Sequence, residues 1–344
     1  MRQTLSAGAD SAARWRRMLI GREASVVFVI VLLCAAMLFT DAREAFYSQR
    51  NLLNVSRQVS LLAIIAIGET LVIITSGIDL SVGSLIAFTG MTVALLVTRL
   101  GAVLEPWAAV SLAAALTMAM SLGIGAVHAA MVHLLRLPPF VVTLASLLIL
   151  RSQALVMNDQ LPITLEKWPA LLFLANGNLF EGSSVAIPVP VVIMAVVAVT
   201  AGLCLGRTRM GRYIYSVGSN ETATRLSGVN VFGVKLFAYG ASALVGGMAG
   251  ILWASYGGQG DPLAGQSYEL DAVAASVVGG ANLNGGQGTV QGTLLGAALL
   301  MLIFSAINLT LSKPDLWRGS VVGGILLLAV LVTALQQRRR GVQA

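Results

Sequence analysis

Charged residues are scarce in this chain. Only 11% of its 344 residues are Asp, Glu, Lys or Arg, whereas a soluble domain carries about 25%. Hydrophobic residues make up 57%, and the mean hydropathy is +0.84. This balance excludes an ordinary soluble enzyme. Because several apolar tracts reach about 18 residues, the length of a membrane-spanning helix, we expect an all-α protein that crosses a membrane many times.

Residues that commonly carry chemistry are also rare. Two cysteines, Cys34 and Cys204, lie within apolar tracts and provide neither a disulfide framework nor a zinc site. The two histidines, His128 and His133, are five residues apart and do not share a helix face, so we expect no metal site. A phosphate-binding loop is lacking, because the nearest approach, 228–235, places its lysine one position late. We expect no catalytic residue and no cofactor in this chain.

Ten apolar tracts follow one another along the sequence. They lie at about 24–40, 58–75, 79–98, 107–134, 139–157, 187–206, 234–256, 268–281, 289–311 and 318–336. The first follows several arginines but lacks a cleavage pattern, so we interpret it as an uncleaved membrane helix. The tracts predict a single membrane domain over 24–336, with basic tails at 1–23 and 337–344.

The basic residues are unevenly distributed between the loops. An even number of spans places both termini on one side, and the loops on that side hold most of the 22 Lys and Arg residues. The positive-inside rule assigns that side to the cytoplasm. The net charge of +7 is then explained by topology, and we expect no nucleic-acid partner. The external segments 158–186 and 257–271 are acidic on balance.

A polar interruption follows the second apolar tract. Asp79, Ser81 and Ser84 lie in the stretch 75–85, which is otherwise surrounded by apolar residues. A charge at membrane depth costs roughly 2.5–3.5 kcal/mol on insertion scales unless it faces protein or a water-filled path. Broken segments that contain glycine are typical of transport pathways. This stretch therefore predicts a transporter.

The other ionisable residues within the tracts are Glu69, Arg151, Glu269 and Asp271. One interpretation places them along a translocation path together with the polar residues of 75–85. The other is structural, with Arg151 paired to Glu69 or Asp79 inside the bundle, and with Asp79 capping the next helix. Both interpretations are open at this stage.

The two halves of the chain share a pattern. In the first half, a polar break that contains glycine occupies 77–84 and precedes a helix. In the second half, a short interrupted segment occupies 268–281. Such pairs suggest an inverted repeat with a path between its halves. The pairs Gly246/Gly250 and Gly292/Gly296 predict close helix contacts, because small residues let backbones approach.

The segment 207–233 is the longest polar interruption on the cytoplasmic side. Ser219 or Asn220 can cap a short helix that carries Glu221 in its first turn, and Gly228 can end it. Val217, Ala223 and Leu226 are expected to form a small apolar face. Such a helix either rests on lipid or docks into a partner, and its few large apolar residues favour a protein partner.

Four segments resemble a known family. The chain is similar to the ribose-type permeases of bacterial ATP-binding-cassette importers, which are related to branched-chain amino acid permeases. The order and spacing of the segments fit over roughly 50–335. Ser76 stands where glycine is common, and Thr222 and Thr224 replace residues that are often acidic or alanine. The segments are 68–84 (Gly-Glu-Thr-Leu-Val-Ile … Gly-Ile-Asp-Leu-Ser-Val-Gly-Ser), 137–144 (Leu-Pro-Pro-Phe-Val-Val-Thr-Leu), 211–231 and 268–289.

The resemblance implies a type II importer fold, similar to the cobalamin importer, with ten helices in the bacterial inner membrane. It implies four partners: a second permease subunit of the same or a homologous chain, a cytoplasmic ATPase that binds ATP and Mg, a periplasmic binding protein, and a sugar. The segment 211–231 matches the family's coupling region, which meets the ATPase. The coupling residues carried over are Gly211, Arg212, Gly218, Ser219, Asn220, Glu221, Arg225, Leu226, Ser227 and Gly228.

Other functions remain open from the sequence. A secondary transporter driven by an ion gradient could use Glu69 and Asp79 as buried carboxylates, but it would leave 207–233 without a role. Relatives import different solutes, including pentoses, hexoses and autoinducer-2, so the sequence does not name the substrate. A membrane-embedded enzyme would need a nucleophile or metal set that the sequence lacks. Aromatic residues make up only 6%, which suggests a path without a strong sugar-stacking site.

Overall fold

The computed structural model describes residues 22–180 and 186–339. The two predicted basic tails, 1–23 and 337–344, lie for the most part outside these described residues.

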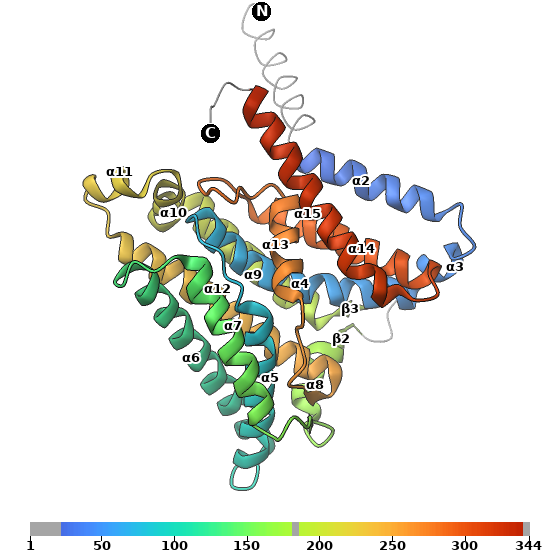
Figure 1. Ribbon diagram of the computed structural model, residues 1–344. Coiled ribbons are helices and arrows are strands. Elements are labelled where there is room, and N and C mark those ends of the chain that lie inside the picture. The colour runs from blue at the N-terminus through green and yellow to red at the C-terminus, as the bar shows by residue number, and fades with distance from the viewer. Residues whose placement is uncertain (1–21, 181–185, 340–344) are drawn as a thin grey trace, which may run out of the picture.

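Each of the ten predicted apolar tracts contains one helix (Figure 1). Seven of them are long and apolar enough to cross a membrane, namely α4, α5, α6, α7, α9, α12 and α14. The protein is therefore a polytopic, mostly helical membrane protein. The ten helices are α2 (Arg22–Met37), α4 (Gln49–Ile74), α5 (Val82–Leu100), α6 (Pro106–His133), α7 (Pro139–Val156), α9 (Val189–Arg207), α12 (Val231–Gly257), α13 (Tyr268–Val278), α14 (Val290–Thr310) and α15 (Pro314–Arg339).

Short elements connect these helices. They are α3 (Arg43–Phe46), α8 (Pro169–Asn176), α10 (Arg209–Ser219), α11 (Glu221–Leu226), β1 (Ile163–Thr164), β2 (Asn178–Leu179), β3 (Ile187–Pro188) and β4 (Gln259–Gly260). Strand β1 pairs antiparallel with β4, and β2 pairs antiparallel with β3. The strands are the one departure from the predicted all-α class, and the β1–β4 pair joins the two segments predicted to be external.

Helix α4 forms the centre of the bundle, in contact with α9, α12, α13 and α14. Every residue from Ser60 to Ile74 is buried. Helices α6, α7 and α9 cover the outside and expose large apolar side chains such as Leu116, Leu148 and Val196. A helix that is apolar all round suits a core position, whereas exposed apolar side chains at this density suit contact with lipid.

Small residues bring the central helices together, as predicted. A Cβ at Gly250 would overlap Thr89 Oγ1, and one at Gly296 would overlap the Ala275 carbonyl. The predicted close contacts at the two glycine pairs are therefore confirmed, and they bring α12 against α5 and α14 against α13.

Both ends of the described chain lie at the same end of the bundle. Thr289, at the start of α14, donates a hydrogen bond of 2.8 Å from its hydroxyl to Glu23 at the start of α2. Helix α15 returns after the 311–313 turn, so its last residues lie at this end too (Figure 1). Helices α10 and α11 lie here, and we call it the α10 end. The opposite end, with the strands, is the β end.

Helices α5 and α13 begin beside each other inside the bundle. Gly83, near the start of α5, lies against Glu269 and against the Gly265 carbonyl. From this junction α5 runs toward the β end, where Gly260 of β4 packs on it. Helix α13 runs the other way, because Gly279 at its end packs on the start of α14. The two breaks therefore place the starts of α5 and α13 in the middle of the bundle, from which the two helices run in opposite directions.

Candidate functional site

The segment 207–233 folds into two short helices, α10 and α11, where the sequence predicted one. Asn220 caps α11 by accepting a hydrogen bond of 2.9 Å from the Ala223 amide. Gly228 follows the helix with a φ of 82°. The predicted cap and stop are confirmed, since both depend on local chemistry. Helix α10, capped by Thr208, was missed although Thr208 is also a preferred capping residue.

The predicted apolar face of this segment is wrong. Val217 lies on α10 and is buried, whereas Ala223 and Leu226 lie on α11 and are exposed, Leu226 by 83%. A break at Asn220 separates the two helices, so helical spacing does not carry across it. Leu226 instead projects from the end of α11 as an isolated apolar side chain.

The ten candidate coupling residues divide into three groups by burial. Gly211 and Gly218 are buried; a Cβ at Gly218 would overlap the Ile74 carbonyl at the end of α4. Both glycines are packing residues. Glu221 is half-buried. The exposed members are Arg212, Ser219, Asn220, Arg225, Leu226, Ser227 and Gly228, which we call the α10–α11 surface.

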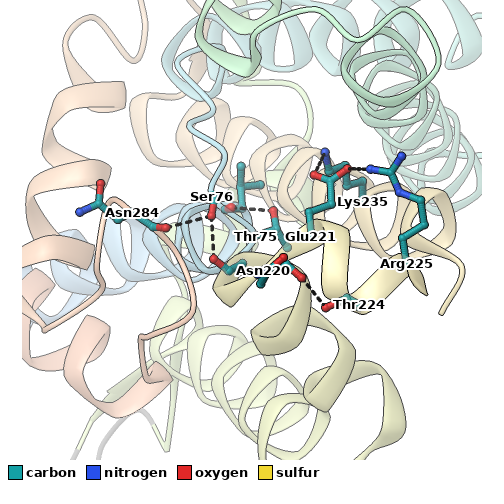
Figure 2. A network of polar contacts seen from close by, with 10 residues as sticks. Thr75, Ser76, Asn220, Glu221, Thr224, Arg225, Lys235 and Asn284 are labelled. Atoms are coloured by element: carbon teal, nitrogen blue, oxygen red, sulfur yellow. Dashed lines mark hydrogen bonds and ion pairs between the residues drawn. The ribbon is translucent and has the colours of Figure 1, made fainter. Parts of the chain in front are cut away.

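Glu221 fastens α11 to α12. Its carboxylate accepts hydrogen bonds of 2.8 Å from Lys235 Nζ and 3.0 Å from Arg225 (Figure 2). Partial burial raises the pKa of Glu221, but the Lys235 hydrogen bond and the charges of Lys235 and Arg225 outweigh it, so this pKa is lowered overall. Glu221 is therefore ionised at neutral pH, and it fixes how the α10–α11 surface is presented.

Ser76 joins three segments at the α10 end. Its hydroxyl lies 3.0 Å from both the Gly218 carbonyl of α10 and the Asn284 carbonyl of the glycine-rich loop 279–289 (Figure 2). Ser76 has a φ of 62°, in the left-handed region that favours glycine. A glycine would adopt this backbone conformation without the strain that a side chain adds. The serine adds a polar link between the end of α4 and α10.

A cavity of about 580 Å³ opens at the same end, between the end of α4, the 134–138 loop, α11 and α12. Four basic side chains and one carboxylate line it: His133, Arg136, Arg225, Lys235 and Glu221. Tyr239 also contributes to its wall. The α10 end therefore presents a hollow, positively charged face beside the α10–α11 surface.

Asp79 and Glu69 form a buried acidic pair at the first helix break. Asp79 Oδ1 accepts hydrogen bonds of 3.0 Å from the Ser81 amide and 2.5 Å from its hydroxyl, and Oδ2 accepts one of 3.1 Å from Ser242. The Asp79 amide donates to Glu69 Oε1 at 3.2 Å. Both acids are completely buried. Asp79 thus holds the turn that leads into α5 through Ser81. It is not the predicted cap of this helix, because Ser81 is the N-cap residue and no side chain among the described residues caps α5. Ser84 donates a hydrogen bond to the Ser81 carbonyl at the start of the helix.

The predicted pairing of Arg151 with Glu69 or Asp79 is wrong. Its guanidinium donates hydrogen bonds to the carbonyls of Pro262 and Ala264 at 3.0 and 2.7 Å and to that of Gly83 at 3.3 Å. Arg151 therefore ties the segment 258–267 to the start of α5. These partners are separated from it by 68 to 113 positions in the sequence, so no local pattern could reveal them.

The two acidic residues of α13 have different surroundings. Glu269 is half-exposed and lies against Gly83 at the helix junction. Asp271 is buried and forms an ion pair with Arg318 of α15. The sequence pattern did not predict this pair, because the two residues meet only through tertiary packing. Within the described chain, no group of three or more His, Cys, Asp or Glu residues could hold a metal ion.

Comparisons with known proteins give the family. The chain matches the family described as "Branched-chain amino acid transport system / permease component" over residues 51–331. It is 40% identical over 313 residues to the ribose import permease protein RbsC of Escherichia coli (strain K12), covering 90% of this chain and 93% of that protein. No solved structure matches it.

Other relatives agree in length and kind. The ribose import permease protein RbsC of Haemophilus influenzae is 37% identical, with 92% of this chain and 93% of that protein covered. The xylose transport system permease protein XylH of the same organism is 30% identical, with 93% and 98% covered. Since the family match spans most of a polytopic helical chain, this protein belongs to the permease component family of branched-chain amino acid transport systems.

Proposed function

We propose that this chain is the membrane-spanning permease subunit of an ATP-driven importer for a monosaccharide. The carrying observation is its similarity to ribose import permeases over about nine-tenths of both chains. A separate cytoplasmic ATPase supplies the energy, a periplasmic binding protein delivers the sugar, and a second copy or homologue of this chain completes the path. The bilayer is the bacterial inner membrane.

The topology follows the type II importer fold with ten crossings. Its support is one helix in each of the ten apolar tracts, and two chain ends at one end of the bundle. Basic residues of the loops gather at that end, which makes it the cytoplasmic end by the positive-inside rule. The two oppositely directed starts of α5 and α13 are the pattern expected of an inverted repeat.

The translocation path passes the junction of the two helix breaks. Gln266 and Ser267, just before α13, are exposed at mid-bundle, and Arg151 and Glu269 are half-exposed beside them. Polar groups at membrane depth require water or protein around them. They would therefore line a hydrated route, with Asp79, Ser81 and Ser84 as the buried support behind it.

The ATPase docks on the α10–α11 surface. A movement of α10 is transmitted to the first helix break by Ser76, which contacts α10 and lies just after the end of α4. The permease itself needs no nucleotide site, because ATP and Mg are bound by the ATPase. Arg212→Glu reverses an exposed charge on α10 without disturbing packing. We expect it to abolish ATP-driven uptake while leaving membrane insertion unchanged, and Arg99→Glu at the β end serves as the matched control.

Reconstitution tests the proposal. Vesicles contain this chain with its ATPase, receive a periplasmic binding protein from outside, and are supplied with ATP and no ion gradient. Uptake of a labelled pentose or hexose is expected only when ATP is present. Uptake that needs a proton or sodium gradient and ignores ATP would refute it.

One observation favours the second candidate, a transporter driven by an ion gradient. Glu69 is completely buried, and its Oε2 atom has no hydrogen-bond partner among the described residues. Proton-coupled carriers use buried carboxylates of this kind. The vesicle assay separates the two candidates, and a substrate panel that includes autoinducer-2 separates sugars from other small polar solutes.

A further inference from the structure

A second cavity lies at the β end, enclosed by parts of α4, α12, α13, α14 and α15. Its volume is about 230 Å³. We propose that this cavity is a binding subsite for a single monosaccharide on the way to the helix junction. The choice of a sugar, rather than of a polar ring in general, rests on the proposed import function.

Four aromatic residues line this subsite. Trp253 and Tyr268 stand edge to face with ring centroids 4.8 Å apart, and Tyr256 lies 6.1 Å from Trp253. Phe304 of α14 adds a fourth ring. In a chain with only 6% aromatic residues, this concentration is notable because the sequence suggested no stacking site. Aromatic faces give a small ring a large contact area with little loss of side-chain freedom.

The residues that line the cavity also carry four polar groups. Gln58 and Asn308, which line the cavity, carry side-chain amides, and the lining residues Tyr256 and Trp253 carry a hydroxyl and an indole N–H. None of these four groups has a hydrogen-bond partner in the part of the chain that the structure describes. Together they offer donors and acceptors. A ligand rich in hydroxyls satisfies both kinds at once.

Arg318 holds the floor of the subsite in place. Its guanidinium is paired with the buried Asp271 and lies over two rings, 5.2 Å from the centroid of Tyr268 and 4.5 Å from that of Phe304. A planar guanidinium held by an ion pair and by two neighbouring rings keeps its remaining N–H groups in a set direction. We infer that Arg318 is a positioning residue that also presents a donor to the ligand.

The volume of the cavity and the polar groups of its lining together determine which ligand fits. Pockets for drug-sized molecules measure about 300–1,000 Å³, so 230 Å³ suits a single small ring. A lipid acyl chain offers no hydrogen bonds to the four polar groups of the lining, whereas the hydroxyls of a sugar can pair with them. The cavity reaches from Asn308, near the β end, to Tyr268, which begins α13 at the helix junction.

Fluorescence of Trp253 provides the test. The purified full chain, in lipid nanodiscs, is titrated with D-ribose, D-xylose and D-galactose, and with glycerol as a small polyol control. We expect a saturable, millimolar change in emission with at least one sugar and none with glycerol. Trp253→Phe should remove this change, whereas Trp107→Phe, which alters an exposed tryptophan far from the cavity, should retain it.

Two further variants test sugar binding separately from folding. Asn308→Ala and Gln58→Ala remove unpaired wall groups, and each should weaken sugar binding about tenfold, the effect of one hydrogen bond. Gln291→Ala, on an exposed site of α14 at the α10 end, should bind like the parent. A change in emission that survives Trp253→Phe, equal binding by all variants, or no saturable change with any sugar would overturn the inference.

The subsite and the proposed function can fail separately. ATP-driven uptake in vesicles together with no sugar response would reject the subsite alone. A saturable response lost in Asn308→Ala, together with uptake that ignores ATP, would reject the proposed function alone. Detection of a bound phospholipid by native mass spectrometry that is displaced by Asn308→Phe would reject the sugar in favour of a lipid.

Discussion

The two helix breaks look alike in sequence and differ in structure. At the first, 75–81, the Asp79 carboxylate accepts three hydrogen bonds and is completely buried. At the second, 258–267, the backbone is held by Arg151 from another helix, and Gln266 and Ser267 are exposed. The first break is buried around the Asp79 carboxylate, and we call it the dry joint; the second is partly exposed, and we call it the hydrated joint. A repeated sequence pattern therefore does not imply the same mechanical role in each half.

The largest expected effect comes from opening the dry joint. Asp79→Ala leaves the Ser81 amide, the Ser81 hydroxyl and the Ser242 hydroxyl without their acceptor. Each orphaned buried group costs about 1–3 kcal/mol, so the variant should lose at least about 3 kcal/mol of stability. The midpoint of unfolding in detergent measures this loss. An unchanged midpoint would mean that the first break is not the rigid one.

The conformation of Ser76 gives the next largest effect. A β-branched residue at a φ of 62° is strained by about 1–2 kcal/mol, and it also loses the link to α10. Ser76→Val should therefore destabilise the α10 end and reduce ATP-driven uptake. Ser76→Gly is the control, because it relieves the backbone while losing only the hydroxyl. Equal behaviour of the two variants would show that the positive φ has no influence.

The hydrated joint should respond more mildly in stability and more strongly in transport. Arg151→Ala removes hydrogen bonds to carbonyls that water can replace in part, so the expected loss is about 1–2 kcal/mol. Uptake by the Arg151→Ala variant should fall well below uptake by the Arg151→Lys variant, because lysine keeps the charge but lacks the several N–H donors of a guanidinium. If Arg151→Ala unfolds as readily as Asp79→Ala, the contrast between the two breaks disappears.

The smallest expected effect is the pH dependence of stability that Glu221 gives the α10 end. Because the pKa of Glu221 is lowered in the folded protein, its ion pairs stabilise the fold above the ordinary pKa of 4.5, and this contribution is lost as the pH falls through the lowered value. The side chain is 35% exposed, so the contribution is under about 1 kcal/mol. Unfolding midpoints of parent and Glu221→Gln should differ at pH 7 and converge near pH 3.

Local chemistry made part of this structure predictable. The apolar tracts located ten helices, because a long apolar run has one stable conformation in lipid. Asn220 and Gly228 were recognised because capping needs only neighbours in the sequence. The pairing of Asp271 with Arg318, the carbonyl contacts of Arg151 and the aromatic cavity were not, since their members come from separate helices. The division of 207–233 into two helices was missed for a different reason: the Thr208 cap was overlooked.

The contact between Thr289 and Glu23 has a practical consequence. It brings the start of α2 to the end of the bundle at which α15 finishes. Two copies can therefore be encoded as one tandem polypeptide, with a linker that never has to traverse the bilayer. A damaging substitution placed in only one half of that fusion would reveal whether a single intact protomer suffices for uptake.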